Sequence, residues 1–112
     1  MAAYTEKKLV EGTLLTAAAV TLYTCTAPAA KTIVKELTLC NTTAIAYTFT
    51  LYVVQSGQVA ADRYAVFKSV TMQPNETKIF GLTNVLEVGD FISALASTTG
   101  VLSISVSGVE RT

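Results

Sequence analysis

The chain has 112 residues, of which 51% are hydrophobic and 14% are charged, and its formal net charge is zero. This length fits one domain better than two, and the charged fraction lies well below the roughly 25% of an ordinary soluble domain. A surface with so little charge is poorly protected against association. The composition therefore favours a subunit covered by neighbours over a free monomer.

Cationic residues are too scattered for nucleic-acid binding, which requires clustered Lys and Arg. The pair Lys7-Lys8 is the only adjacent one, and Glu6 and Glu11 flank it. No run approaches the roughly 18 apolar residues of a membrane span. Threonines interrupt the apolar stretch 14–22, which favours a strand over a signal peptide. We expect neither a nucleic-acid partner nor a membrane partner.

The first residues, 1–12, mix charged side chains with Tyr4, Leu9 and Val10. We expect an N-terminal arm that lies along a neighbouring subunit, where it adds a strand or fills a groove. Tyr4, Leu9 and Val10 are the predicted assembly contacts, and the folded domain is expected to span residues 13–112.

The remainder is rich in Thr, Val, Ile, Tyr and Phe, which suit a pleated sheet. Turn signals recur every eight to twelve residues or so, a spacing typical of a sandwich or barrel. We predict an all-β fold: a single β-sandwich, jelly-roll or immunoglobulin-like, of seven to eight short antiparallel strands. In chain order, the predicted strands are 18–26, 32–40, 46–54, 69–72, 77–82, 91–96 and a last one that includes 102–107. The segment 60–67 fits either a helical turn or a crossover.

Two predicted strands show a clear period of two. Tyr47, Phe49, Leu51 and Val53 share one face of 46–54, and the last strand alternates apolar Leu102, Ile104 and Val106 with Ser103, Ser105 and Ser107. The serine face is expected to be either hydrated or packed against a neighbouring subunit.

Predicted turns connect these strands. One lies at 27–31 and contains Pro28, and Asn41-Thr42-Thr43 is expected to close a hairpin over 32–54. Further turns are expected at 73–76, 88–90 and 99–100.

Cys25 and Cys40 are the only cysteines. They could form a disulfide between adjacent strands if their Cα atoms lay within about 7 Å, or they could be thiols that pack as small hydrophobes. Nothing else in the sequence indicates an oxidising compartment, which favours free thiols.

Histidine is absent, which removes the commonest general base and the commonest neutral metal ligand. The carboxylates that could be imagined as an acid–base pair lie in predicted turns or beside a cation: Asp62, Glu76, Glu87 and Asp90. We expect no enzymatic activity, no cofactor and no bound metal.

Four segments resemble small all-β virion structural proteins of tailed phages: 35–43, 73–77, 85–94 and 104–110. The order of a turn, a strand, Leu-Glu-Val-Gly-Asp and another strand is similar to that in viral jelly-roll domains. The resemblance implies a virion component made in the host cytoplasm.

Three functions follow as expectations. The first is a capsid decoration or cement protein that binds the major capsid protein on the outer capsid surface as a homo-oligomer such as a trimer. The second is a tail, collar or fibre-attachment protein. The third is a carbohydrate- or receptor-binding sandwich, which would require an exposed aromatic platform, whereas the tyrosines fall mostly within predicted strands.

Overall fold

The computed structural model describes residues 3–26 and 29–112, in which eight strands and one short 3-10 helix form. The prediction of an all-β sandwich is confirmed. The elements are β1 (Tyr4–Leu14), β2 (Val20–Thr24), β3 (Lys31–Asn41), β4 (Tyr47–Val54), η1 (Asp62–Tyr64), β5 (Ala65–Met72), β6 (Thr77–Glu87), β7 (Phe91–Ala96) and β8 (Leu102–Arg111).

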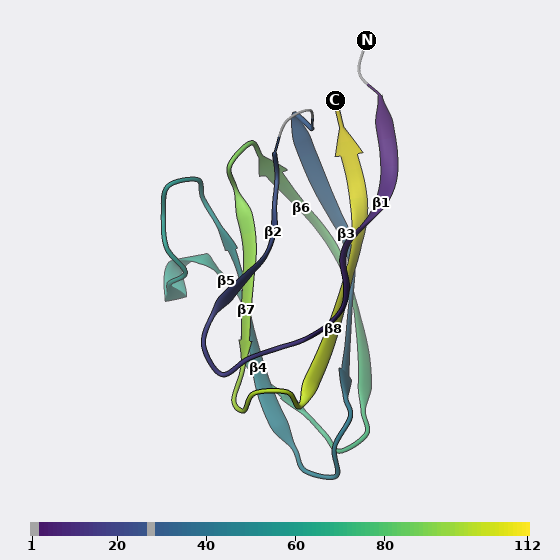
Figure 1. The fold of residues 1–112 in the computed structure, drawn as a ribbon, viewed down its shortest axis with the longest axis vertical. Helices are drawn as coiled ribbons and strands as arrows, with labels where there is room; N and C mark the ends of the chain where they lie inside the picture. Colours follow the sequence, from purple (N-terminus) through teal and green to yellow (C-terminus); the bar gives the residue numbers. More distant parts are fainter. Residues whose placement is uncertain (1–2, 27–28) are drawn as a thin grey trace.

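The strands form two four-stranded antiparallel sheets that pack face to face (Figure 1). Sheet A has the order β1-β8-β3-β6, and sheet B has the order β2-β7-β4-β5. Consecutive strands alternate between the sheets at every step except β4 to β5, and the first strand pairs with the last. Of the two predicted architectures, the structure is the jelly roll, a double sheet of eight strands.

The core lies between the sheets and follows the predicted alternation. In β8, Leu102, Ile104 and Val106 are at most 1% exposed, whereas Ser105 and Ser107 are exposed. In β4, Phe49 and Leu51 belong to the same core. Three rings, those of Phe49, Phe67 and Phe80, have centroids 4.5 to 6.0 Å apart and join β4 and β5 of sheet B to β6 of sheet A.

The predicted N-terminal arm is wrong for residues 4–12, which form most of β1. This strand pairs with β8 along its length, from Tyr4 opposite Arg111 to Leu14 opposite Ser103. A β-bulge at Leu9 brings both Leu9 and Val10 into the core, where they are 8% and 5% exposed. The sandwich therefore begins before residue 13.

Gly108 explains how Leu9 fits into the core. It lies in β8 opposite Lys7, one residue from the bulge, and a Cβ on it would lie 2.9 Å from Leu9 Cδ1 and 2.3 Å from the Ile33 carbonyl oxygen. Only glycine leaves this space free. Leu9 and Val10 thus belong to a strand, although charged residues surround them in the sequence, because Gly108 on the neighbouring strand leaves room for the Leu9 side chain.

The predicted hairpin over 32–54 is also wrong, because β3 lies in sheet A and β4 lies in sheet B. The turn itself is present, and the buried Asn41 side chain holds it. Its Nδ2 donates to the carbonyl oxygens of Ile45 (2.8 Å) and Met72 (3.2 Å), and its Oδ1 accepts from the Thr43 amide (3.0 Å). The turn therefore links the sheets rather than pairing two neighbours.

Two further predicted segments are the ambiguous stretch 60–67 and the proline turn at 27–31. The ambiguous segment 60–67 contains η1 and the first residues of β5. Residues 27 and 28 of the predicted proline turn lie outside the described residues.

The cysteines are free thiols, as expected. Cys25 is fully buried in the core, whereas Cys40 is partly exposed on the opposite side of β3 from the core residue Leu39. Sheet A therefore separates the two sulfur atoms. Within the described part of the chain, no helix is long and apolar enough to cross a membrane.

Candidate assembly surface

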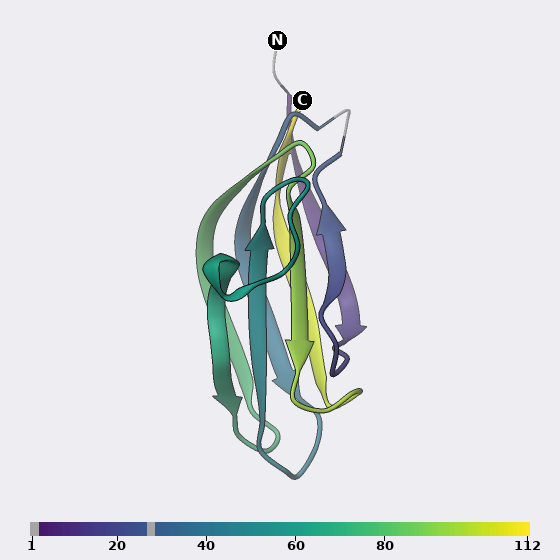
Figure 2. The ribbon, with the colours of Figure 1, turned by 90° about the vertical axis from the view of Figure 1, so that its left-hand side faces the viewer.

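The chain itself covers the central part of the outer face of sheet B, whereas Thr71 of the edge strand β5 stays exposed. The connection from Gln55 to Tyr64, which includes η1, crosses in front of β4 (Figure 2). The outward-facing side chains of β4 are buried: Thr50 is 5% exposed, Tyr52 is 9% exposed and Val54 is fully buried. The centre of this face therefore has little surface left for a partner.

Asp90 fixes one end of that covering segment. Its Oδ1 accepts a hydrogen bond from the Ser56 amide (2.9 Å), and its Oδ2 accepts one from the Glu87 amide (3.0 Å). Gly89, at φ 94°, lies so close that a Cβ on it would be 2.3 Å from Ser56 Oγ. One carboxylate thus attaches the covering segment to the β6–β7 turn.

The outer face of sheet A, in contrast, is open along β8. Ser105 and Ser107 are exposed, Ser103 is partly exposed, and Thr38 and Cys40 of β3 lie in register beside Ser105 and Ser103. All of these side chains are short, so a partner could approach the sheet closely. The serine row predicted from the sequence is therefore a surface feature of this sheet.

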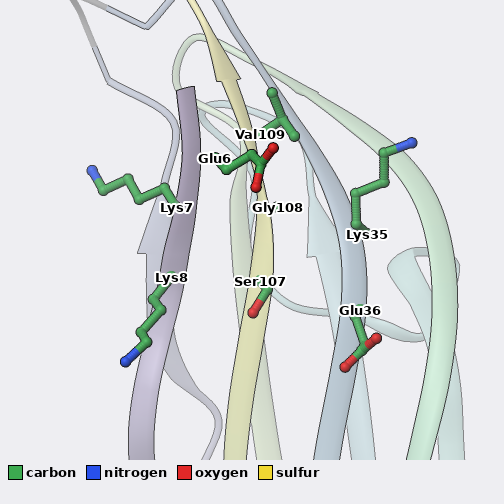
Figure 3. Close-up of a pocket in the computed structure, with 8 residues that line it drawn as sticks. All are labelled: Glu6, Lys7, Lys8, Lys35, Glu36, Ser107, Gly108 and Val109. Atoms are coloured by element: carbon green, nitrogen blue, oxygen red, sulfur yellow. The ribbon is translucent and has the colours of Figure 1, made fainter. Parts of the chain in front are cut away.

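Longer charged side chains border the upper part of this face and form a depression of about 550 Å³. Figure 3 shows its lining residues, contributed by β1, β8 and β3: Glu6, Lys7, Lys8, Lys35, Glu36, Ser107, Gly108 and Val109. Small-molecule sites are mostly apolar and enclose their ligand. An open depression with charged walls is better suited to a macromolecular surface.

Four of these charges form no ion pair with another described residue. Glu6, Lys8, Lys35 and Glu36 take part in none of the ion pairs found in the described ranges 3–26 and 29–112. Those ion pairs are Lys7–Glu110, Lys31–Glu87, Lys68–Asp62 and Lys78–Glu76. Half of the eight charged side chains without an ion pair in those ranges therefore border one depression.

A polar cluster closes the end of the sandwich nearest the termini. The Tyr23 hydroxyl of β2 donates to Glu110 of β8, and Lys7 Nζ of β1 lies 3.3 Å from Glu110 Oε2. Burial, supported by the hydrogen bond to Glu110, raises the pKa of Tyr23 to about 12. This cluster connects sheet B to sheet A, so its role is structural.

Possible metal ligands and one unsatisfied hydroxyl group are the remaining features of the described residues. Among them, no group of three Cys, Asp or Glu side chains is placed to hold a metal ion. The buried Tyr64 hydroxyl has no hydrogen-bond partner in this part of the chain, and the Arg63 guanidinium lies 4.9 Å from the Tyr64 ring centroid. These two side chains belong to η1, on the covered side of sheet B.

The three residues predicted to contact a neighbouring subunit lie in different environments in the structure. Leu9 and Val10 are core residues of their own chain, whereas Tyr4 is 67% exposed at the edge of sheet A. The sequence analysis missed Lys35 and Glu36. In the sequence, these two charged residues interrupt the apolar alternation of β3. In the structure, a bulge between Val34 and Glu36 turns both charges outward.

No family model matches the sequence, and no curated protein matches it. The fold is similar to solved structures at low sequence identity. A T13 viral particle of infectious bursal disease virus matches with a TM-score of 0.62 and 7% identity, over 98% of this chain and 30% of that chain. The infectious bursal disease virus VP2 subviral particle matches with a TM-score of 0.58 and 10% identity, over 98% and 32%.

A third neighbour comes from Bacillus endospore appendages, described as a family of disulfide-linked pili. It matches with a TM-score of 0.56 and 14% identity, over 99% of this chain and 88% of that chain. This chain therefore spans about a third of the viral proteins but most of the appendage protein. At these identities, the likeness shows a shared jelly-roll fold.

Proposed function

We propose that the protein is a non-enzymatic structural component of a phage particle that decorates the outer capsid surface. The observation that carries this proposal is the unequal exposure of the two sheets. The chain covers the central strand β4 of sheet B and leaves β8 of sheet A open, with short side chains and unpaired charges beside it. Such a face is suited to contact between subunits.

Two further observations support a structural role. The low charge leaves the surface prone to association, and the same sandwich architecture occurs in the viral particles described above. The absence of histidine from the sequence supports a protein without a catalytic centre. The major capsid protein is the proposed partner, and the virion, assembled from proteins made in the host cytoplasm, is the proposed location.

The test is co-sedimentation of the purified protein with capsids that lack it. Such capsids come from a deletion mutant of a phage that normally encodes the protein. We expect saturable binding, and a particle map should show the added density on the outer capsid surface. Density confined to the tail or collar would replace decoration with the tail-type alternative. Absence of binding to both heads and tails would contradict a virion role.

A filament subunit is the second candidate, favoured by the appendage neighbour of which this chain spans 88%. In that case, the concentrated protein should polymerise without capsids. Electron microscopy of the protein alone distinguishes the candidates, because a decoration protein gives discrete small oligomers and a filament subunit gives fibres.

A further inference from the structure

We propose that two copies of the protein pair face to face through the outer faces of sheet A, about a twofold axis parallel to β8. In this dimer, Lys8 of each copy meets Glu36 of the other, and Glu6 of each meets Lys35 of the other. The inference rests on the proposed role as a multicopy structural component and names the partner of its open face as a second copy of the chain.

The first step is the position of the four charges. Lys8 of β1 and Glu36 of β3 are both in register with Ser107 of β8, so they flank it at the same height. One row further toward the termini, Glu6 is in register with Val109, whose partner on β3 is Ile33. Lys35 lies in the bulge of β3, between Val34, which is opposite Gly108, and Glu36. In Figure 3, Lys8 and Glu36 flank β8, the Glu6 carboxylate lies above them in front of β8, and the Lys35 side chain extends upward from β3 to a similar height.

The second step is the effect of the symmetry on these charges. A twofold axis parallel to β8 exchanges the β1 side with the β3 side and preserves height along the strand. Lys8 and Glu36 form one row, and the ends of the Glu6 and Lys35 side chains lie at a similar height above it, so the rotation places opposite charges near each other at both levels. A twofold interface is self-complementary in this sense, and such complementarity provides specificity between partners.

The third step selects this axis over the other one in the sheet plane. An axis perpendicular to β8 and centred between the two rows would instead pair Lys8 with Glu6 and Lys35 with Glu36. That centre lies near residue 108, close to one end of β8 (Leu102–Arg111), so the sheets would overlap over only part of their length. The parallel axis aligns the whole strand and brings all three serines into the interface.

The fourth step concerns close approach. Sheets with side chains of ordinary size lie about 10 Å apart, and a row of serines allows two sheets to come closer than this. Ser103, Ser105 and Ser107 lie on the axis and meet their own copies, where hydroxyl groups donate and accept equally well. Their small size allows the longer charged side chains on either side to reach across.

Charge reversal tests this arrangement. Sedimentation equilibrium of Lys8→Glu and of Glu36→Lys should show a dimer dissociation constant raised about tenfold or more, because each reversal creates two like-charge contacts per dimer. The combined variant should return close to the wild-type value. Arg63→Glu, on the η1 side of the sandwich, is the matched control and should leave the constant unchanged, and circular dichroism verifies the fold of every variant.

Three results would overturn the proposal: a wild-type protein that stays monomeric, single reversals without effect, or rescue of Lys8→Glu by Glu6→Lys rather than by Glu36→Lys. The proposed function is tested separately by particle binding. If the protein is a monomer that still binds capsids, the dimer proposal is wrong and the decoration role stands. If it is a dimer that binds no part of the virion, the decoration role is wrong and the dimer proposal stands.

Discussion

The two outer faces of the sandwich differ in what covers them. Over sheet B, the ten-residue connection Gln55–Tyr64 crosses β4, whose outward-facing Thr50, Tyr52 and Val54 are buried. Over sheet A, no described segment lies across β8, and Ser105 and Ser107 remain exposed beside unpaired charges. The chain thus covers the central strand β4 of one face and leaves the central strand β8 of the other open, and this difference is the basis for the proposal of assembly through sheet A.

The largest expected effect comes from removing the edge strand of the open sheet. Deletion of residues 1–11 should unfold the domain, because it removes the buried side chains of Leu9 and Val10 and most of the pairing with β8. Burial of two such side chains contributes about 3 to 6 kcal/mol, comparable to the whole stability of a small domain.

Circular dichroism of the truncated protein provides the measurement, with Tyr4→Ser as the control for an exposed residue of the same strand. A truncated protein that remains folded but fails to assemble would restore the arm interpretation.

The second prediction compares the two sides of β8. Ile104→Asp should unfold the domain, because an unpaired buried charge is destabilising by several kcal/mol. Ser105→Asp, on the open face, should change the melting temperature by only a few degrees. Equal melting temperatures for the two variants would show that the inner and outer faces of sheet A are misassigned.

This alternation was predictable from the sequence, as were the turn at 88–90 and most strand positions, because they depend on local period and turn chemistry. The pairing of strands was not. The hairpin expected over 32–54 satisfies the same local rules as the sheet-to-sheet link that forms, and the Asn41 bond to the distant Met72 carbonyl distinguishes them.

The prediction of an arm over residues 1–12 was wrong for a related reason. Charges in the sequence around Leu9 and Val10 are typical of an arm, and the glycine that accommodates Leu9 lies about a hundred residues away, at Gly108. Part of the candidate surface was predictable: the serine row follows from a period of two in the sequence. The arrangement of Glu6, Lys8, Lys35 and Glu36 was not predictable, because it depends on the register between three strands.

The third prediction concerns the covered face. Asp90→Ala should lower the free energy of unfolding by about 1 to 3 kcal/mol, because the amides of Ser56 and Glu87 lose a charged acceptor. Faster amide exchange in residues 55–61 should accompany the change. Asp62→Asn, which breaks only an exposed ion pair with Lys68, is the control and should leave the free energy of unfolding almost unchanged. Unchanged exchange in Asp90→Ala would mean that other contacts hold the covering segment.

The smallest expected effect lies at the end of the sandwich, where Tyr23 joins the sheets. Its folded pKa of about 12 exceeds the ordinary value of 10.0, so this group contributes its full stabilisation below pH 10. That contribution is lost as pH rises from about 10 to 12, because the unfolded chain releases the proton first. The loss should be on the order of 1 kcal/mol, reduced by solvent screening of this partly exposed group.

Urea unfolding of wild type and Tyr23→Phe across that pH range measures the loss. The variant should be less stable at neutral pH, and the difference between the two proteins should shrink toward pH 12. A constant difference would contradict the role of the Tyr23–Glu110 hydrogen bond.

The most direct test of the open face is a cysteine at its centre. In a Cys40→Ser background, Ser107→Cys should form a covalent dimer under mild oxidation, since residue 107 would meet its own copy on the twofold axis. Thr71→Cys, exposed on the outer side of sheet B, should remain monomeric under the same conditions. Cross-linking at residue 107 alone is the predicted result. Equal cross-linking at both positions, or none at residue 107, would contradict an interface through sheet A.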